Sequence, residues 1–267
     1  GLWPSLQSHR RTLLTYALGM FVAGGIAILM DIGKPARVLN LLTSPQWKSP
    51  FIWDFFSLMI IVVVTLVYLF VRSKSRLLSW VAGIMAAMVI IIEGLILGVL
   101  ASRPLWHGGL MPVLFFLEAM TAGSAFLVLV LPYQSWIRKA LLYLLVITGL
   151  VMLIDAAALL FGGPTAAKDA MTLMLSGNLA VWFWAQILFG IVLPVILLAA
   201  VPGSRTAALI ASVLAILGVL LSKLTLLTAG QAVPLMGPAD TYMPTLVELG
   251  IHRGISELGI GVPSGSR

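Results

Sequence analysis

Long apolar runs dominate this sequence, and each is long enough to cross a membrane as a helix. An α-helix rises 1.5 Å per residue, so about 20 apolar residues span the roughly 30 Å of hydrocarbon in a bilayer. The strands of a membrane barrel would instead give short segments of alternating hydropathy. The runs lie near residues 12–31, 51–71, 77–101, 110–131, 137–161, 180–201 and 206–229. We therefore predict an all-α integral membrane protein, an antiparallel bundle of transmembrane helices with seven visible spans.

The composition agrees with a membrane environment. Hydrophobic residues make up 61% of the 267 residues and charged residues only 9%, whereas soluble domains carry about 25% charged residues. The connections between runs are mostly short, and no hydrophilic stretch is long enough for a second folded unit. We expect residues 1–267 to form a single transmembrane domain. Residues 234–267 are only half apolar, which fits either an outer loop and tail or the start of a further helix.

The distribution of basic residues predicts the orientation. The loops on the side of the N-terminus hold eight bases and no acid: Arg10, Arg11, Arg72, Lys74, Arg76, Arg138, Lys139 and Arg205. The opposite loops hold five bases and three acids: Lys34, Arg37, Lys48, Arg103, Lys168, Asp31, Asp54 and Asp169. By the positive-inside rule the N-terminus is cytoplasmic and the 31–50 loop is periplasmic, in the cytoplasmic (inner) membrane of a prokaryote. The net charge of +7 thus reflects topology, and we expect no nucleic-acid partner.

The residue types that are scarce limit the redox chemistry. The chain contains no cysteine, so it cannot ligate an iron–sulfur cluster. Its three histidines, His9, His107 and His252, lie outside the expected spans, so no helix-borne pair can bind a haem. The sequence also lacks a phosphate-binding glycine loop of the GxxxxGK[ST] type. We expect no haem, no iron–sulfur cluster and no metal site in this chain.

Four ionisable residues lie inside the expected spans: Glu93, Glu118, Asp155 and Lys223. Such residues are costly in hydrocarbon and commonly mark function. Glu93 and Glu118 fall at matched depth on neighbouring antiparallel helices, roughly 12 Å below the outer face, while Asp155 and Lys223 lie at about 9 Å. A carboxylate pair in such a place is a candidate proton acceptor.

Two interpretations of these four residues remain open. They can lace helices together, for example through a buried ion pair between Asp155 and Lys223. Alternatively they line a polar pocket that opens to the outer face, with Asp31, Arg37 and Arg103 of the adjoining loops at its rim. Because all four lie in the outer half of the membrane, we favour the pocket.

Four segments resemble the NrfD-like polysulfide reductase membrane subunits. They are MDIGKPARVLNLLTSPQWKSPFIWDFF at 30–56, EGLILGVLASRPLW at 93–106, LMPVLFFLEAMTAGSAF at 110–126 and KLTLLTAGQAVP at 223–234. Together they span most of the chain in the family's order. The first carries the D-[LI]-G-[RK]-P-x-R pattern, and the second contains its Arg-Pro-x-Trp turn.

The resemblance implies a quinone-interacting membrane anchor with eight or more helices, in which the first visible run corresponds to the family's second helix. Such anchors bind menaquinone or ubiquinone, carry no cofactor of their own, and are not catalytic alone. They dock a ferredoxin-like iron–sulfur subunit, which connects to a molybdopterin enzyme or a multihaem cytochrome. The further expected contact is with membrane lipid.

The resemblance also assigns residues. Asp31, Gly33, Pro35 and Arg37 match the family pattern, and Lys34 replaces its usual arginine, which keeps the charge but loses bidentate geometry. Arg103 matches the Arg-Pro-x-Trp turn, where an interfacial anchor is as good an interpretation as a functional role. Lys223 stands where relatives commonly carry arginine. Glu93 and Glu118 depart from the family, whose members often have uncharged polar or small residues there.

We therefore predict a quinone-binding subunit that exchanges electrons with an iron–sulfur partner and handles quinol protons. Quinol is expected among the spans near 12–31, 51–71, 77–101 and 110–131, with its head at the outer face. Proton transfer is assigned to Glu93, Glu118 and Asp31, quinone binding to Asp31, Arg37, Glu93, Arg103 and Glu118, and supporting charge to Asp155 and Lys223. The alternatives are an ion- or proton-conducting or transporter-like subunit, and a purely structural anchor.

Overall fold

The computed structural model describes residues 4–31, 38–70 and 76–233, and every regular element within them is a helix. Seven helical segments of these residues are long and apolar enough to cross a membrane. They are α2 (Arg10–Asp31), α4 (Pro50–Phe70), α5 (Arg76–Gly98), α6 (Met111–Val130), α7 (Ser135–Gly162), the composite span Ala180–Ala200 and α11 (Arg205–Ala232). Each lies within a few residues of a predicted run, so the predicted helical membrane bundle is confirmed.

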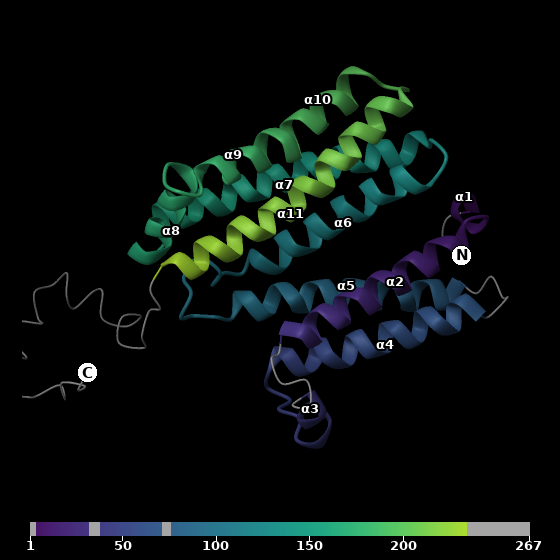
Figure 1. The fold of residues 1–267 in the computed structure, drawn as a ribbon, viewed down its shortest axis with the longest axis horizontal. Coiled ribbons are helices and arrows are strands. Elements are labelled where there is room, and N and C mark those ends of the chain that lie inside the picture. Colours follow the sequence, from purple (N-terminus) through teal and green to yellow (C-terminus); the bar gives the residue numbers. More distant parts are fainter. Residues whose placement is uncertain (1–3, 32–37, 71–75, 234–267) are drawn as a thin grey trace, which may run out of the picture.

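The spans fall into two groups that α5 and α6 join (Figure 1). In the first group, α4 packs between α2 and α5. In the second group, α6 packs against α7 and α11, and α11 also packs against the composite span. One face of α11 is buried in these contacts, and Ser212, Ser222 and Thr225 lie on that face, whereas large apolar residues such as Leu217 and Leu220 are exposed.

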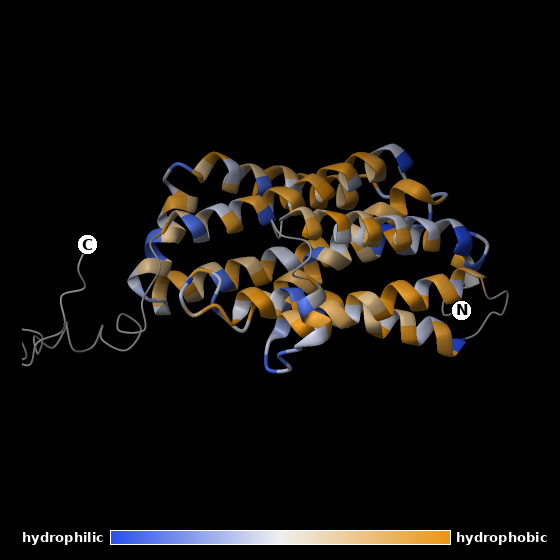
Figure 2. Cartoon of the chain, turned by 60° about the horizontal axis from the view of Figure 1, so that its bottom comes forward, coloured by the Kyte–Doolittle hydropathy of each residue, from blue (hydrophilic) through white to orange (hydrophobic). Residues whose placement is uncertain are grey.

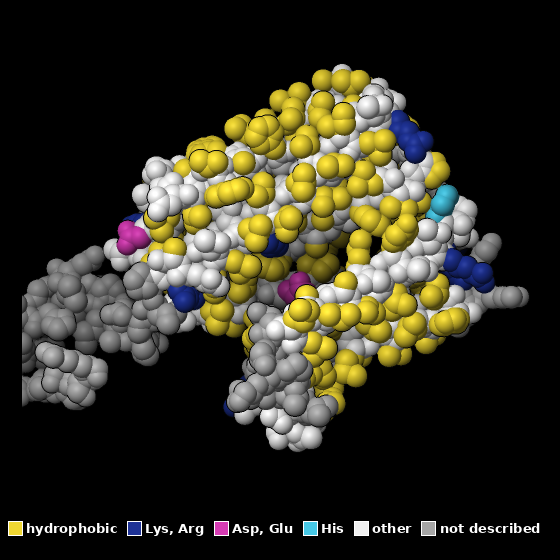
Figure 3. Space-filling model, in the orientation of Figure 1, with side chains coloured by type: hydrophobic (Ala, Val, Ile, Leu, Met, Phe, Trp, Pro, Cys, Tyr) yellow, Lys and Arg dark blue, Asp and Glu magenta, His cyan; other side chains and the backbone are white. Residues whose placement is uncertain are grey.

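The outer surface is apolar along the helices. Orange, hydrophobic segments run the length of the spans in Figure 2, and apolar side chains cover most of the face in Figure 3. Large apolar residues such as Met20, Val63 and Leu153 are exposed in midspan positions. Exposed apolar surface of this extent is stable only against lipid. The chain is therefore a multi-pass membrane protein.

The connection between α7 and the composite span contains a helix where we expected only a loop. This helix, α8 (Thr165–Leu175), follows Pro164 and buries one face, formed by Ala167, Ala170, Met171 and Met174. Ala170, Met171 and Met174 pack in one cluster with Leu105, Trp106, Phe183 and Ala229. The short amphipathic pattern escapes a search for long apolar runs, because only one face of the helix is apolar.

The composite span consists of α9 (Ala180–Ile187), a π-helical turn at Leu188–Val192 and α10 (Leu193–Ala200). Pro194 has no backbone N–H to donate, and such a gap in the hydrogen-bond ladder favours a π-turn. Within the turn, Gly190 meets Gly218 of α11 so closely that a Cβ on either residue would collide with the other's Cα. The two backbones are therefore in direct contact.

Several charged residues that we assigned to loops lie in helices, and Arg138 and Asp54 are two of them that are at least partly buried. Arg138 is buried in the first turn of α7 and donates a hydrogen bond to the Leu198 carbonyl in the last turn of α10. Asp54 lies in the first turns of α4 and is half-buried. Both residues stand near the start of a predicted run, at 51–71 and 137–161, and were counted with the adjoining loops because they are charged. The short helices α1 (Pro4–Gln7) and α3 (Leu39–Thr43) complete the described elements.

Candidate functional site

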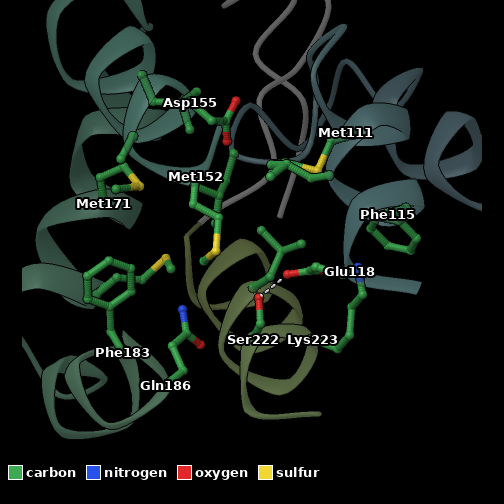
Figure 4. A pocket seen from close by; sticks show the side chains of 16 residues that line it. Met111, Phe115, Glu118, Met152, Asp155, Met171, Phe183, Gln186, Ser222 and Lys223 are labelled. Atoms are coloured by element: carbon green, nitrogen blue, oxygen red, sulfur yellow. Dashed lines mark hydrogen bonds and ion pairs between the residues drawn. The ribbon is translucent and has the colours of Figure 1, made fainter. Parts of the chain in front are cut away.

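A buried ion pair between α6 and α11 forms the centre of the site. Glu118 on α6 is only 4% exposed, and its Oε2 pairs with the Lys223 ammonium of α11. The Ser222 hydroxyl donates a hydrogen bond of 2.6 Å to the other carboxylate oxygen, Oε1 (Figure 4). A buried ion pair is stable only when such additional hydrogen bonds satisfy its remaining atoms. Each carboxylate oxygen of Glu118 thus has a partner.

The side-chain pattern of the two helices explains why this pair forms. On α6, Glu118 belongs to a stripe with Leu114, Thr121 and Ala125, all buried. The facing stripe of α11 consists of small residues at helical spacing: Ala211, Ala215, Gly218, Ser222, Thr225 and Ala229. Small residues let helix backbones approach closely in lipid. The close approach brings Lys223, next to the stripe, within reach of Glu118.

Further groups surround the Lys223 ammonium. The Nζ atom lies 3.1 Å from the centroid of the Phe115 ring, a cation–π contact. The Glu93 carboxylate of α5 lies within electrostatic range of Lys223 and of Asp54. Glu93 itself is exposed on α5, in contrast to the buried Glu118. Lys223 is therefore shared electrostatically between two carboxylates of different accessibility.

A small cavity of about 50 Å³ adjoins the ion pair on the α7 side. Its wall is mainly apolar, with Met152 and Phe183 among the residues (Figure 4). Its polar residues are Glu118, Asp155, Gln186, Ser222 and Lys223. Gln186 is 2% exposed, and its Oε1 has no hydrogen-bond partner among the described residues. The cavity therefore combines an apolar wall with several polar groups that converge on it.

A wider cavity of about 460 Å³ lies between this site and the end of the bundle. The two cavities share Asp155, Met111, Leu105 and Leu159 in their walls. The rest of the wider cavity is lined largely by the α5–α6 and α7–α8 connections: Ala101, Pro104, His107, Gly108, Gly109, Gly162, Gly163 and Pro164. Asp155 thus faces both the site and a large space at the loop end.

Polar side chains also continue past Glu118 toward the middle of the bundle. The Thr121 and Thr148 hydroxyls lie 3.2 Å apart, and both line a cavity of about 20 Å³ that Glu118 and Gln186 share. Gly190 and Gly218 form part of the same wall. This third cavity is large enough for about one water molecule.

Arg103 is engaged with the end of α11. Its guanidinium donates hydrogen bonds of 3.0 and 2.8 Å to the carbonyls of Gly230 and Val233. The neighbouring Trp106 indole donates to the Leu226 carbonyl at 3.0 Å. The last carbonyls of a helix have no partners within the helix and carry a partial negative charge, so a cation stabilises them. The geometry supports an anchoring role for Arg103, and its predicted role in quinone binding stays a prediction.

The structure brings three predicted site residues together around one cavity: Glu118, Asp155 and Lys223. Lys223 pairs with Glu118 and not with Asp155, the partner suggested by the lacing interpretation. Glu93 approaches from the α5 side without lining that cavity. Asp31 is the last residue of α2, but its side chain, like all of Arg37, lies outside the described residues. The predicted proximity of Asp31 and Arg37 to this site therefore stays a prediction.

Four residues of the site were missed from the sequence: Asp54, Phe115, Gln186 and Ser222. Gln186 offered a signal, since it is a lone amide in the middle of an apolar run. Ser222 stands beside Lys223, so it shares the depth of that residue. In the described part of the chain, no group of three or more His, Asp or Glu residues is arranged to hold a metal ion.

Comparison with known proteins relates the chain to membrane subunits of oxidoreductases. The family model described as "Polysulphide reductase, NrfD" matches residues 8–234. A Halobacterium salinarum protein, provisionally named as a membrane subunit of dimethyl sulfoxide reductase, is 26% identical over 95% of this chain and 72% of its own length. The Hdr-like menaquinol oxidoreductase integral membrane subunit of Archaeoglobus fulgidus is 24% identical over 68% of this chain and 51% of its own length.

Proposed function

Because the chain belongs to the NrfD polysulphide reductase family, we propose that it is the quinone- or quinol-binding membrane subunit of a respiratory oxidoreductase. Two relatives are named as membrane subunits of reductases, one of them a menaquinol oxidoreductase. The chain would not be catalytic alone, because oxidation of quinol requires a partner that accepts the electrons. The substrate is menaquinone or ubiquinone.

The observation that carries this proposal is the Glu118–Lys223 pair inside the membrane helices. Ionisable groups at this depth are costly, and they commonly serve proton or charge transfer. In our proposal the Lys223 ammonium donates a hydrogen bond to a quinone oxygen and stabilises negative charge there. Glu118 accepts a proton from quinol, and Glu93 offers a second carboxylate for the second proton. Ser222 holds Glu118 in position.

The quinone head would enter from the α5 side, where Glu93 is exposed and the Phe115 ring lies beside Lys223. The cavity on the α7 side, at about 50 Å³, holds about two water molecules and is too small for a quinone ring. The apolar tail would lie along the exposed apolar faces of the spans. Asp31, Arg37 and Arg103 remain proposed residues of the outer rim.

We propose that electrons pass between the quinone and a ferredoxin-like iron–sulfur subunit, which connects to a molybdopterin enzyme or a multihaem cytochrome. The chain would lie in the cytoplasmic membrane of a prokaryote as one membrane domain. Its N-terminus would be cytoplasmic, and residues 31–50 would face the periplasm and the partner. The excess of bases on the N-terminal side supports this orientation.

The test is quinone-linked turnover of the assembled complex carrying Glu118→Gln or Glu93→Gln. Glutamine keeps the shape but removes the base, and loss of general-base help typically lowers a rate about 100-fold to 10,000-fold. Electron transfer from an artificial donor to the partner should persist in both variants. Asp169→Asn is the matched control, because Asp169 is exposed on α8 away from the site. Turnover at the wild-type rate in both glutamate variants would refute the proposed proton acceptors.

An ion- or proton-conducting subunit is the second candidate. It is favoured by the polar groups that continue past Glu118, namely Thr121, Thr148 and Gln186. The quinone-linked subunit and the conducting subunit differ in whether they need a partner subunit to move protons. A conducting subunit carries protons across vesicle membranes when it is reconstituted alone, whereas a quinone-linked subunit moves protons only during turnover of the complex.

A further inference from the structure

Asp155 occupies a position that the proposed quinone chemistry does not use. It lies on α7, is partly buried, and lines both the small cavity beside Glu118 and the wide cavity at the loop end. Among the described residues, no side chain forms a hydrogen bond or an ion pair with its carboxylate. An unpaired carboxylate inside a membrane helix is costly and is a candidate for proton transfer.

The wide cavity beyond Asp155 is suited to water. Its volume of about 460 Å³ has room for on the order of fifteen water molecules at about 30 Å³ each. Four glycines line it, and their backbone polar groups are not covered by side chains of their own. The imidazole of His107, an exposed residue, forms part of the same wall. The cavity is therefore a roomy space at the end of the bundle, whose wall is mostly apolar but includes polar groups that water can contact.

The small cavity connects Asp155 to Glu118. Both carboxylates belong to its wall, and Figure 4 displays them with Met152 and Met111 around the same space. Glu118 lies seven residues from the start of α6, and Asp155 lies seven residues from the end of α7. At 1.5 Å per residue both are about 10 Å below the loop end, so they face each other at one depth. About two water molecules fit in this small cavity.

We propose that Asp155 is a proton relay between Glu118 and an aqueous mouth formed by the α5–α6 and α7–α8 connections. This inference rests on the proposed function, because it takes Glu118 as the acceptor of a quinol proton. It adds a role for Asp155 and a route by which protons leave the site. It also separates the side on which quinone binds from the side on which protons leave. Quinone approaches from α5, and protons leave past α7.

In the direction of quinol oxidation, every proton and electron has a destination. Quinol loses two electrons to the iron–sulfur partner and two protons, of which one passes to Glu93, which releases it to the outer aqueous phase, and the other passes to Glu118. That proton moves through water to Asp155 and then to water in the wide cavity, so that each carboxylate is restored after one turnover. Quinone reduction uses the same groups in reverse order, with the proton entering from the mouth.

The decisive variant is Asp155→Asn in the assembled complex. We expect quinone-linked turnover to fall at least 10-fold, with unchanged binding of a quinone analogue and unchanged electron transfer from an artificial donor. A small weak acid such as formic acid, which fits the wide cavity, should restore part of the lost rate. Asp155→Glu, which keeps a carboxylate, should retain most of the turnover. Asp169→Asn, at the same end of the bundle, should neither lose turnover nor respond to formic acid.

Three results would overturn the relay. Full turnover in Asp155→Asn would remove Asp155 from the proton route and leave the proposed function intact. Weaker binding of the quinone analogue would instead assign the wide cavity to the quinone ring. A loss of turnover that formic acid does not relieve would indicate a structural role. If the wild-type complex neither binds the analogue nor turns over with quinone, the proposed function itself fails.

A second variant covers the case in which Asp155→Asn does not assemble. Ala158→Phe adds a ring to an exposed position in the wall of the wide cavity and leaves Asp155 in place. Filling the mouth should lower quinone-linked turnover several-fold, again without a change in analogue binding. Turnover at the wild-type rate in this variant would contradict an exit through this cavity.

Discussion

A double-mutant cycle can test how much each member of the Glu118–Lys223 pair contributes to the stability of the protein. The substitutions are Glu118→Gln, Lys223→Met and the two combined. Removal of one member of a buried pair costs about 3 to 5 kcal/mol, because the remaining charge has no partner. Replacement of both members by uncharged residues of similar size is often close to neutral.

The surroundings decide which single substitution costs more. The Glu118 side chain is 5% exposed, whereas that of Lys223 is 26% exposed. Without Glu118, the Lys223 ammonium keeps the Phe115 ring and the nearby Glu93, and its long stem can extend toward a more polar region. Without Lys223, the Glu118 carboxylate keeps only Ser222 as a hydrogen-bonding partner among the described residues. We therefore expect the free energy of unfolding to fall by about 3 kcal/mol in Glu118→Gln and by about 5 kcal/mol in Lys223→Met.

The assay is thermal unfolding of the purified complex in lipid nanodiscs, followed by tryptophan fluorescence. At about 2 °C per kcal/mol for a chain of this size, the melting temperature should fall by about 6 °C and about 10 °C in the two single variants. The double variant should melt within about 2 °C of the wild type, yet lack quinone-linked turnover. If Glu118→Gln is the more destabilising change, or if the double variant shows the sum of the two losses, the reasoning from burial is wrong.

Three further predictions concern the orientation, the cofactors and the packing of the chain. Ser44→Cys should react with an impermeant thiol reagent in intact cells and Ser135→Cys should not, since the chain has no other thiol; the opposite result would reverse the proposed orientation. The purified subunit should show no haem absorption, and a Soret band that persists after the partner subunits are removed would contradict this. Gly230→Ala should destabilise the protein by about 1 to 3 kcal/mol, because a Cβ there collides with the Trp106 indole; an unchanged melting temperature would show that the indole moves aside.

The spans and the family could be predicted from the sequence, because both depend on local patterns. Apolar length alone locates a transmembrane helix, and the structure agrees with the predicted runs to within a few residues. The resemblance drawn from four motifs is confirmed by the family match over residues 8–234. The helix α8 was missed because it is short and only one of its faces is apolar.

The partners within the site could not be predicted, because they depend on the rotation of each helix about its own axis. Depth along a helix follows from residue number, so the similar depth of Glu118, Asp155 and Lys223 in the membrane could be predicted from the sequence. Depth does not say which side of the helix faces inward. Glu93 and Glu118 therefore looked equivalent in the sequence, whereas one is exposed and the other is buried.

The contact between Gly190 and Gly218 also bears on the dimensions of the site. Gly190 lies one helical turn beyond Gln186, and Gly218 lies one turn before Ser222. Rotamer changes cannot alter the spacing there, because the contact joins main chain to main chain. Any side chain at either glycine wedges the two helices apart and moves Gln186 away from Ser222. The width of the polar interior is thus governed by two residues that have no side chain with which to touch a ligand.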